Sequence, residues 1–154
     1  MSINKIKGAV TLPKIRTGAP EPPYTYLGIA QQVMKGVKIL ASSSEEAVIS
    51  LYILAAHVLE CSLKAYLAKQ GYSEKKLRER PYGHNLGNLW KEAEAKGLKI
   101  QTMAPDWVNR LSELHGGPRY LLRYSTGVHA IVGPPIKSMV SELGEILATV
   151  QSQI

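Results

Sequence analysis

The sequence predicts an all-α fold: a four- to five-helix up-and-down bundle around one long central helix, with a loop or short hairpin before the last helix. Two observations support this prediction. Apolar residues recur at helical spacing in several separate stretches, and one of these, residues 44–71, is apolar enough to be surrounded by the others. A chain of 154 residues is long enough to form one domain with its own core.

The central helix is predicted to begin near Ser44 and to end at Gly71. Ser43 and Glu46 have the spacing of a capping box, which satisfies backbone N–H groups at a helix start. Gly71 can adopt the left-handed conformation that ends many helices. Since the apolar residues cover most of the circumference, we expect other helices to surround this one.

The polar residues of this helix fall on one narrow stripe, formed by Glu46, Ser50, His57, Glu60 and Lys64. Glu60 and Lys64 are an i, i+4 pair in the order that stabilises a helix. The simpler interpretation is that the stripe is the solvated face of the helix, where the pair contributes only a few tenths of a kcal/mol. The functional alternative is that His57, Glu60 and Lys64 line a groove or a dimer seam, where His57 could titrate.

Four further helices are predicted from apolar residues at helical spacing. They cover residues 24–41, 85–96, 104–115 and 136 to near the C-terminus. Asn85 is a suitable N-cap for the second of these helices. The charged connector 72–83 is predicted to contain a helical turn that Pro81 ends. Residues 119–132 are predicted to be a loop or a short hairpin, because Gly127 and several β-branched residues disfavour a helix there.

Two parts of the chain differ in composition. Residues 1–23 contain four basic residues and four prolines without a sustained period, and they are interpreted either as an extended basic arm or as an ordinary loose terminus. Residues 24–154 are the predicted helical domain. No run of about 18 apolar residues is free of charge, which argues against a membrane span. The N-terminus lacks a signal-peptide core, and the single cysteine, Cys61, excludes an internal disulfide, so we expect a protein of the reducing cytoplasm.

The charge of the chain favours partners that carry phosphate. The formal net charge is +7 and the pI is about 9.5. The densest positive patch lies in the charged connector 72–83, and it consists of Lys75, Lys76, Arg78 and Arg80. This patch is either a solvated loop or a phosphate contact.

The sequence contains none of the common motifs for cofactors or metals. It has no Gly-rich phosphate loop, no cysteine pair or His-x-x-x-His for zinc, and no Gly-x-Ser-x-Gly nucleophile elbow. We therefore predict no cofactor and no metal site.

Histidines and arginines are the remaining candidates for chemistry. Metal-free cleavage of RNA needs a base for the 2′-hydroxyl proton and a cation that stabilises the charge on the phosphorus centre, and His and Arg suit these roles. Arg78 precedes His84, and Arg123 precedes His129, each with five residues between. The alternative is structural: His84 braces the helix that starts beside it, and Arg123 with Tyr124 braces the loop.

Three parts of the chain resemble the HEPN family. Residues 56–67, Ala-His-Val-Leu-Glu-Cys-Ser-Leu-Lys-Ala-Tyr-Leu, resemble the family's long helix with its Glu-x-x-x-Lys core. After a charged linker, residues 83–90, Gly-His-Asn-Leu-Gly-Asn-Leu-Trp, resemble its helix start with His-[Asp/Asn]-Leu. Residues 111–114, followed by Arg123-Tyr124, are similar to the family's leucine helix and Arg-Tyr loop.

The resemblance covers about residues 24–150, and it implies a helical bundle, commonly a homodimer, in prokaryotic toxin–antitoxin, defence or RNA-processing systems. One branch of the family consists of metal-independent endoribonucleases with an Arg and, a few residues later, a His near the last helix. Arg123 and His129 match that position, although Tyr124 stands where this branch usually has Asn or Asp.

A second branch lacks catalysis and accompanies a nucleotidyltransferase or binds nucleotides and nucleic acid. The His84-Asn85-Leu86 and Arg123-Tyr124 pattern resembles this branch better. Such a module, with a nucleotidyltransferase or an antitoxin as possible partner, would present a set of basic residues to RNA or a nucleotide: Lys75, Lys76, Arg78, Arg80, His84, Arg119 and Arg123. The polar stripe and Tyr124 would line its groove or dimer seam. A third alternative is a helical domain that only binds other proteins.

Overall fold

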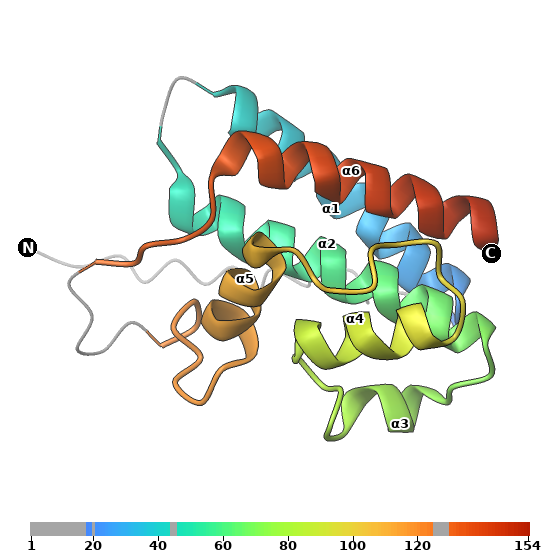
Figure 1. Cartoon of the computed structure of the whole chain (residues 1–154). Helices are drawn as coiled ribbons and strands as arrows, with labels where there is room; N and C mark the ends of the chain where they lie inside the picture. The colour runs from blue at the N-terminus through green and yellow to red at the C-terminus, as the bar shows by residue number, and fades with distance from the viewer. Residues whose placement is uncertain (1–17, 20, 44–45, 125–129) are drawn as a thin grey trace, which may run out of the picture.

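The computed structural model describes residues 18–19, 21–43, 46–124 and 130–154, and these residues form six helices and no strand (Figure 1). The helices are α1 (Tyr24–Ser42), α2 (Val48–Lys69), α3 (Glu74–Arg78), α4 (Leu86–Ala95), α5 (Asp106–Gly116) and α6 (Ile136–Gln153). The prediction of an all-α bundle around one long helix is confirmed. Most of the predicted basic arm, residues 1–17 and 20, lies outside the described residues.

The long helix α2 lies in the middle of the bundle (Figure 1). α1 and α6 cover one side of it, and α4 and α5 cover the other side. Between Leu51 and Leu67 nearly every residue of α2 is buried, because its wide apolar arc packs against all four of these helices. By length and composition α2 could also cross a membrane, but 67% of its most apolar 18-residue window is buried inside the protein.

The two ends of α2 differ from each other in how well the sequence predicted them. At the C-terminal end Gly71 has φ +90°, and the N–H groups of Gly71 and Tyr72 donate to the carbonyl oxygens of Ala68 and Leu67, as in a Schellman motif. At the other end the predicted capping box is wrong. α2 begins at Val48 with Ala47 as its N-cap, and Ser43 instead serves as the C-cap of α1, where its N–H donates to Leu40.

The helices α3 and α4 begin at side-chain caps. The hydroxyl oxygen of Ser73 accepts from the N–H of Lys76 at the start of α3. The carboxamide oxygen of Asn85 accepts from the N–H of Asn88 at the start of α4, as predicted. Within residues 119–132 the described residues form turns and irregular backbone, so they adopt the predicted loop and not the hairpin.

The end of α5 packs closely on the backbone that precedes α4. A Cβ atom added at Gly116 would lie 2.1 Å from the carbonyl oxygen of His84, so only glycine permits this approach. The N–H of Gly87 also donates to the hydroxyl of Ser112 on α5 at 3.3 Å. These contacts bring the connector before α4 and the end of α5 together beside α2.

Candidate functional site

Glu60 is a buried carboxylate in the middle of α2. Glu60 is 5% exposed, and Lys64, one turn later, is 4% exposed. The interpretation of these two residues as part of a solvated face is therefore wrong, because α4 and α5 pack on this part of α2. Glu46, Ser50 and His57 of the same stripe are exposed, as that interpretation predicted.

Three side chains from three segments bind the Glu60 carboxylate. Lys64 Nζ donates to Glu60 Oε1 at 2.7 Å. His115 Nε2, in the last turn of α5, lies 2.7 Å from Oε2, and His84 Nδ1, just before α4, lies 2.9 Å from the same oxygen. The two imidazole rings meet edge to face, with centroids 5.5 Å apart. We call these four residues the Glu60 cluster.

The cluster keeps Glu60 ionised. Burial alone would raise the pKa of Glu60, but the hydrogen bond from His115, the charge and hydrogen bond of Lys64 and the hydrogen bond from His84 outweigh burial and hold the pKa well below its usual range. The charges of Glu60 and Lys64 cancel, so the cluster is neutral when both histidines are neutral.

The hydrogen bonds define the tautomers of the neutral histidines. A carboxylate only accepts hydrogen bonds, so each histidine carries a proton on the nitrogen that faces Glu60. For His84 this nitrogen is Nδ1, which leaves the lone pair of the neutral ring on Nε2. The side chain of His84 is 41% exposed, whereas that of His115 is 6% exposed. His84 therefore connects the buried carboxylate with the surface.

His84 forms part of the wall of a cavity of about 620 Å³ between the connector before α4 and the end of α5. The described residues that line it are Arg78, Arg80, Pro81, Tyr82, Gly83, His84, Asn85, Asn88, Gly116, Gly117, Pro118 and Tyr120. None of these is acidic, and both arginines are exposed. A cavity with two arginines and no carboxylate in its described wall attracts anions.

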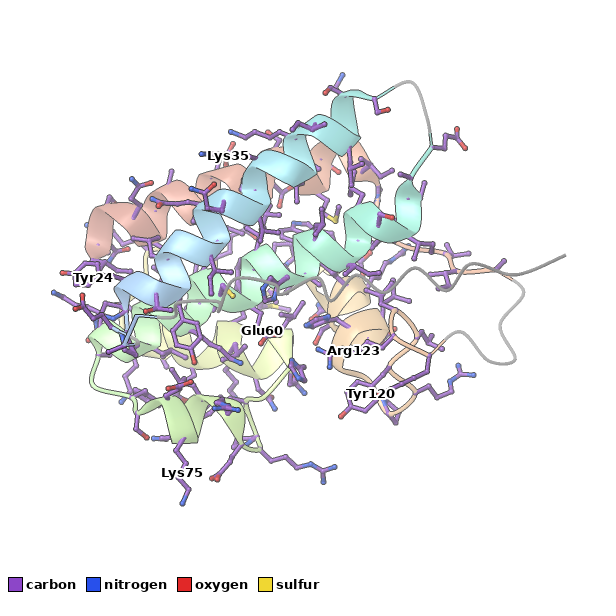
Figure 2. All side chains as sticks on the ribbon, turned by 180° about the vertical axis from the view of Figure 1, so that it is seen from behind. Tyr24, Lys35, Glu60, Lys75, Tyr120 and Arg123 are labelled. Carbon is purple, nitrogen blue, oxygen red and sulfur yellow. The ribbon has the colours of Figure 1, made fainter. Side chains whose placement is uncertain are left out.

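Arg123 contacts His84 from the turn that follows α5. Its Nη2 lies 3.3 Å from Nδ1 and 3.4 Å from Nε2 of His84. The turn is held by hydrogen bonds from the N–H of Arg123 to the carbonyl of Tyr120 and from the N–H of Leu122 to the carbonyl of Leu114 in α5. Figure 2 shows Arg123 and Tyr120 beside each other, on one side of Glu60.

The cavity brings together three of the predicted phosphate-binding residues, namely Arg78, Arg80 and His84. The others are exposed but lie outside its lining: Lys75, Lys76, Arg119 and Arg123. Lys76 Nζ lies 3.9 Å from the centroid of the Tyr72 ring, so this lysine packs on an aromatic side chain. The basic connector is thus divided between the cavity and the surface of α3.

Of the remaining predicted site residues, the structure describes Tyr124 and His57, and both are exposed. Tyr124 is 64% exposed, and its ring meets that of Tyr120 edge to face. His57 is exposed at the surface, and its Nε2 lies 3.8 Å from Cys61 Sγ. The protein nevertheless displaces part of the water around the imidazole, and this desolvation lowers the pKa of His57 despite the nearby charge of Glu60. His129, the predicted partner of Arg123, lies outside the described residues.

Glu60, His84 and His115 could also hold a metal ion, since one ligand atom of each lies within 4.8 Å of the others. The spacing fits direct hydrogen bonds better. Ligand atoms about 2.0–2.1 Å from a tetrahedral zinc ion would be about 3.3 Å apart, whereas here the nitrogens lie 2.7 and 2.9 Å from the carboxylate oxygen. The ammonium group of Lys64 also repels a cation at Glu60.

His115 is the member of the cluster that the sequence analysis missed. It follows Val108 and Leu111 at i+7 and i+4, so helical spacing places it on the apolar face of α5. A histidine on a buried face needs a hydrogen-bond partner, and this need is the sequence signal that could have identified it.

Comparisons with known proteins find no match: no family model matches the chain, and no curated protein or solved structure is significantly similar to it.

Proposed function

We propose that this protein binds RNA or nucleotide phosphates at the arginine-lined cavity beside the Glu60 cluster. The observation that supports this function is that Arg78, Arg80 and His84 line one cavity whose described wall contains no acidic residue. Guanidinium groups suit phosphate oxygens because their donors form a planar fork. The net charge of +7 adds a long-range attraction for such anions.

We also propose that the chain is a HEPN-like module that acts as a homodimer, as the companion of a nucleotidyltransferase or an antitoxin in a prokaryotic toxin–antitoxin or defence system. This proposal rests on the resemblance described above. It gains support from the contacts among its motif residues, since Glu60 binds both Lys64 and His84. Sedimentation equilibrium of the free chain tests the homodimer.

The second candidate function is a metal-independent endoribonuclease that uses Arg123 and His129. The observation in its favour is that the exposed Arg123 lies beside a histidine of the cavity wall, 3.3 Å from His84 Nδ1. A cation beside a histidine is the pairing that metal-free cleavage of a phosphodiester requires.

Binding is tested by fluorescence anisotropy with a labelled single-stranded RNA over a range of salt concentrations. Wild-type affinity should fall steeply with salt, because bound phosphates release counterions. The double variant Arg78→Ala/Arg80→Ala should lower the slope of log affinity against log salt by about 1.4, at about 0.7 for each lost phosphate contact.

The matched control is Lys35→Ala/Lys38→Ala, which removes the same charge from exposed positions on α1. Figure 2 shows Lys35 far from Arg123 and Lys75. This control should keep most of the wild-type slope. A flat slope for the wild type, or equal losses in the two double variants, would contradict phosphate binding at the cavity.

A further inference from the structure

We infer that His84 is the proton-accepting catalytic residue of a metal-independent RNA cleavage at this cavity, held in place by the buried carboxylate of Glu60. The inference rests on the proposed function, because the cavity must first bind RNA phosphate. It differs from the second candidate function in assigning the base to His84.

The geometry around His84 is that of an oriented general base. Glu60 Oε2 accepts from Nδ1 at 2.9 Å, which directs the lone pair of the neutral ring to Nε2. The carboxylate is 5% exposed, so it is protected from water, and it stabilises the imidazolium that forms when Nε2 accepts a proton. The partly exposed His84 ring lines the cavity, where a substrate can reach Nε2.

Two further partners restrict the movement of the cluster. His115 Nε2 lies 2.7 Å from the same Glu60 oxygen, and Lys64 Nζ donates to the other oxygen at 2.7 Å. Both partners are nearly fully buried, so the carboxylate cannot easily rotate away from His84. His115 and Lys64 are therefore positioning residues.

The cations needed for the phosphate lie next to this base. Arg123 Nη2 is 3.3–3.4 Å from the two ring nitrogens of His84, and Arg78 and Arg80 line the same cavity. A guanidinium group that moves from the His84 ring onto a bound phosphodiester would stabilise the negative charge that grows on its oxygens during attack.

The reaction is a transesterification that needs no co-reactant. His84 Nε2 accepts the proton of a 2′-hydroxyl, and the 2′-oxygen forms a bond to the adjacent phosphorus. The bond from phosphorus to the 5′-oxygen breaks, and that oxygen takes a proton from water while His84 returns its proton to the solvent. The products are a 2′,3′-cyclic phosphate and a 5′-hydroxyl. DNA lacks the 2′-hydroxyl, so it can bind but cannot react.

The test compares binding and cleavage of a labelled single-stranded RNA and its all-deoxy counterpart by the full chain in EDTA. The decisive variant is His84→Asn, because its amide N–H can still donate to Glu60 as Nδ1 does, while no base remains. We expect cleavage by His84→Asn to fall about 10²–10⁴-fold with RNA affinity retained. Lys35→Ala, on the exposed surface of α1, is purified in parallel and should cleave as the wild type does.

Each outcome has a separate meaning. RNA binding without cleavage by the wild type would overturn the catalytic role of His84 and leave the proposed binding function intact, whereas loss of both would remove both proposals. Wild-type cleavage rates in His84→Asn, 5′-phosphate products, or activity that requires an added metal ion would each overturn the inference. The inference would also be overturned if His129→Ala lost activity while His84→Asn kept it.

A second measurement covers the case in which His84→Asn does not fold. His84→Ala opens the space of the ring, and added imidazole should restore metal-free cleavage if the missing group is a base. Failure of imidazole to raise the rate of a folded His84→Ala protein would count against the assignment.

Discussion

At the scale of single residues, the site depends on one buried ion pair between Glu60 and Lys64. Removing two charges from water is costly, and the cost is recovered only when hydrogen bonds satisfy every remaining polar atom. Here Lys64 takes one oxygen of Glu60, while His84 and His115 take the other. Removing either member of the pair therefore leaves the other as a buried charge without a partner of opposite charge.

A double-mutant cycle measures this coupling. Glu60→Gln and Lys64→Met should each lower the free energy of unfolding by about 3–5 kcal/mol, because each leaves one buried charge unpaired. The double variant should lose less than the sum of the two, by about 1–3 kcal/mol. Urea unfolding followed by circular dichroism provides the four free energies.

The matched control is the pair Asp106 and Arg110, which has the same i, i+4 spacing and the same 2.7 Å separation but is exposed. Its cycle, with Asp106→Asn and Arg110→Met, should show a coupling of only a few tenths of a kcal/mol. Equal couplings in the two cycles would mean that burial does not strengthen the Glu60 pair.

At the scale of elements, the position of His84 depends on how α5 approaches the start of α4. The carbonyl oxygen of His84 faces Gly116, where no side chain separates the two backbones. The same end of α5 carries His115, so one close contact positions both histidines around Glu60.

Gly116→Ala should disturb this contact. The added Cβ would lie 2.1 Å from the His84 carbonyl oxygen, so α5 or the connector must move, and we expect a loss of about 1–3 kcal/mol in the free energy of unfolding. RNA affinity should fall as well, because His84, Gly116 and both arginines line the same cavity.

Gly28→Ala is the control for the same chemical change within a helix. A Cβ at Gly28 in α1 would meet nothing within 4 Å, so the alanine should stabilise the protein by about 0.5–1 kcal/mol. Urea unfolding of both variants tests the comparison, and a Gly116→Ala protein as stable as Gly28→Ala would refute the close approach.

At the scale of the whole molecule, the Glu60 cluster ties stability to pH. The folded state holds the pKa of Glu60 below its ordinary value of 4.5, so the folded state binds this proton less readily than the unfolded state does. The resulting stabilisation is complete above about pH 4.5, and it is lost as pH falls from there toward the folded-state pKa.

Acid should therefore reduce the difference in free energy of unfolding between the wild type and Glu60→Gln. At neutral pH we expect the wild type to be more stable by a constant amount. Below about pH 4.5 this difference should shrink, because the Glu60 carboxylate takes up a proton and glutamine does not. Thermal and urea unfolding from neutral pH down to about pH 3 would measure it. An advantage that stays constant over this range would show that the Glu60 carboxylate is not stabilised as described.

Much of the candidate site could be predicted from the sequence as a set of residues but not as an arrangement. The charge pattern identified Arg78 and Arg80, and the helix start identified His84, because these signals are local. The cavity that joins them also needs Gly116 and Tyr120, which lie in the segment around the end of α5. Contacts between residues so far apart in the sequence cannot be predicted from spacing or composition.

The sequence by itself determined the helices and most of their ends. Apolar periodicity, the Asn85 cap and the left-handed Gly71 involve residues within a few positions of one another, so they can be predicted locally. Only the tertiary structure decided that Glu60 is buried and which side chains it binds. His84 and His115 lie 24 and 55 residues away in sequence, and the packing of α4 and α5 on α2 brings them to the same oxygen.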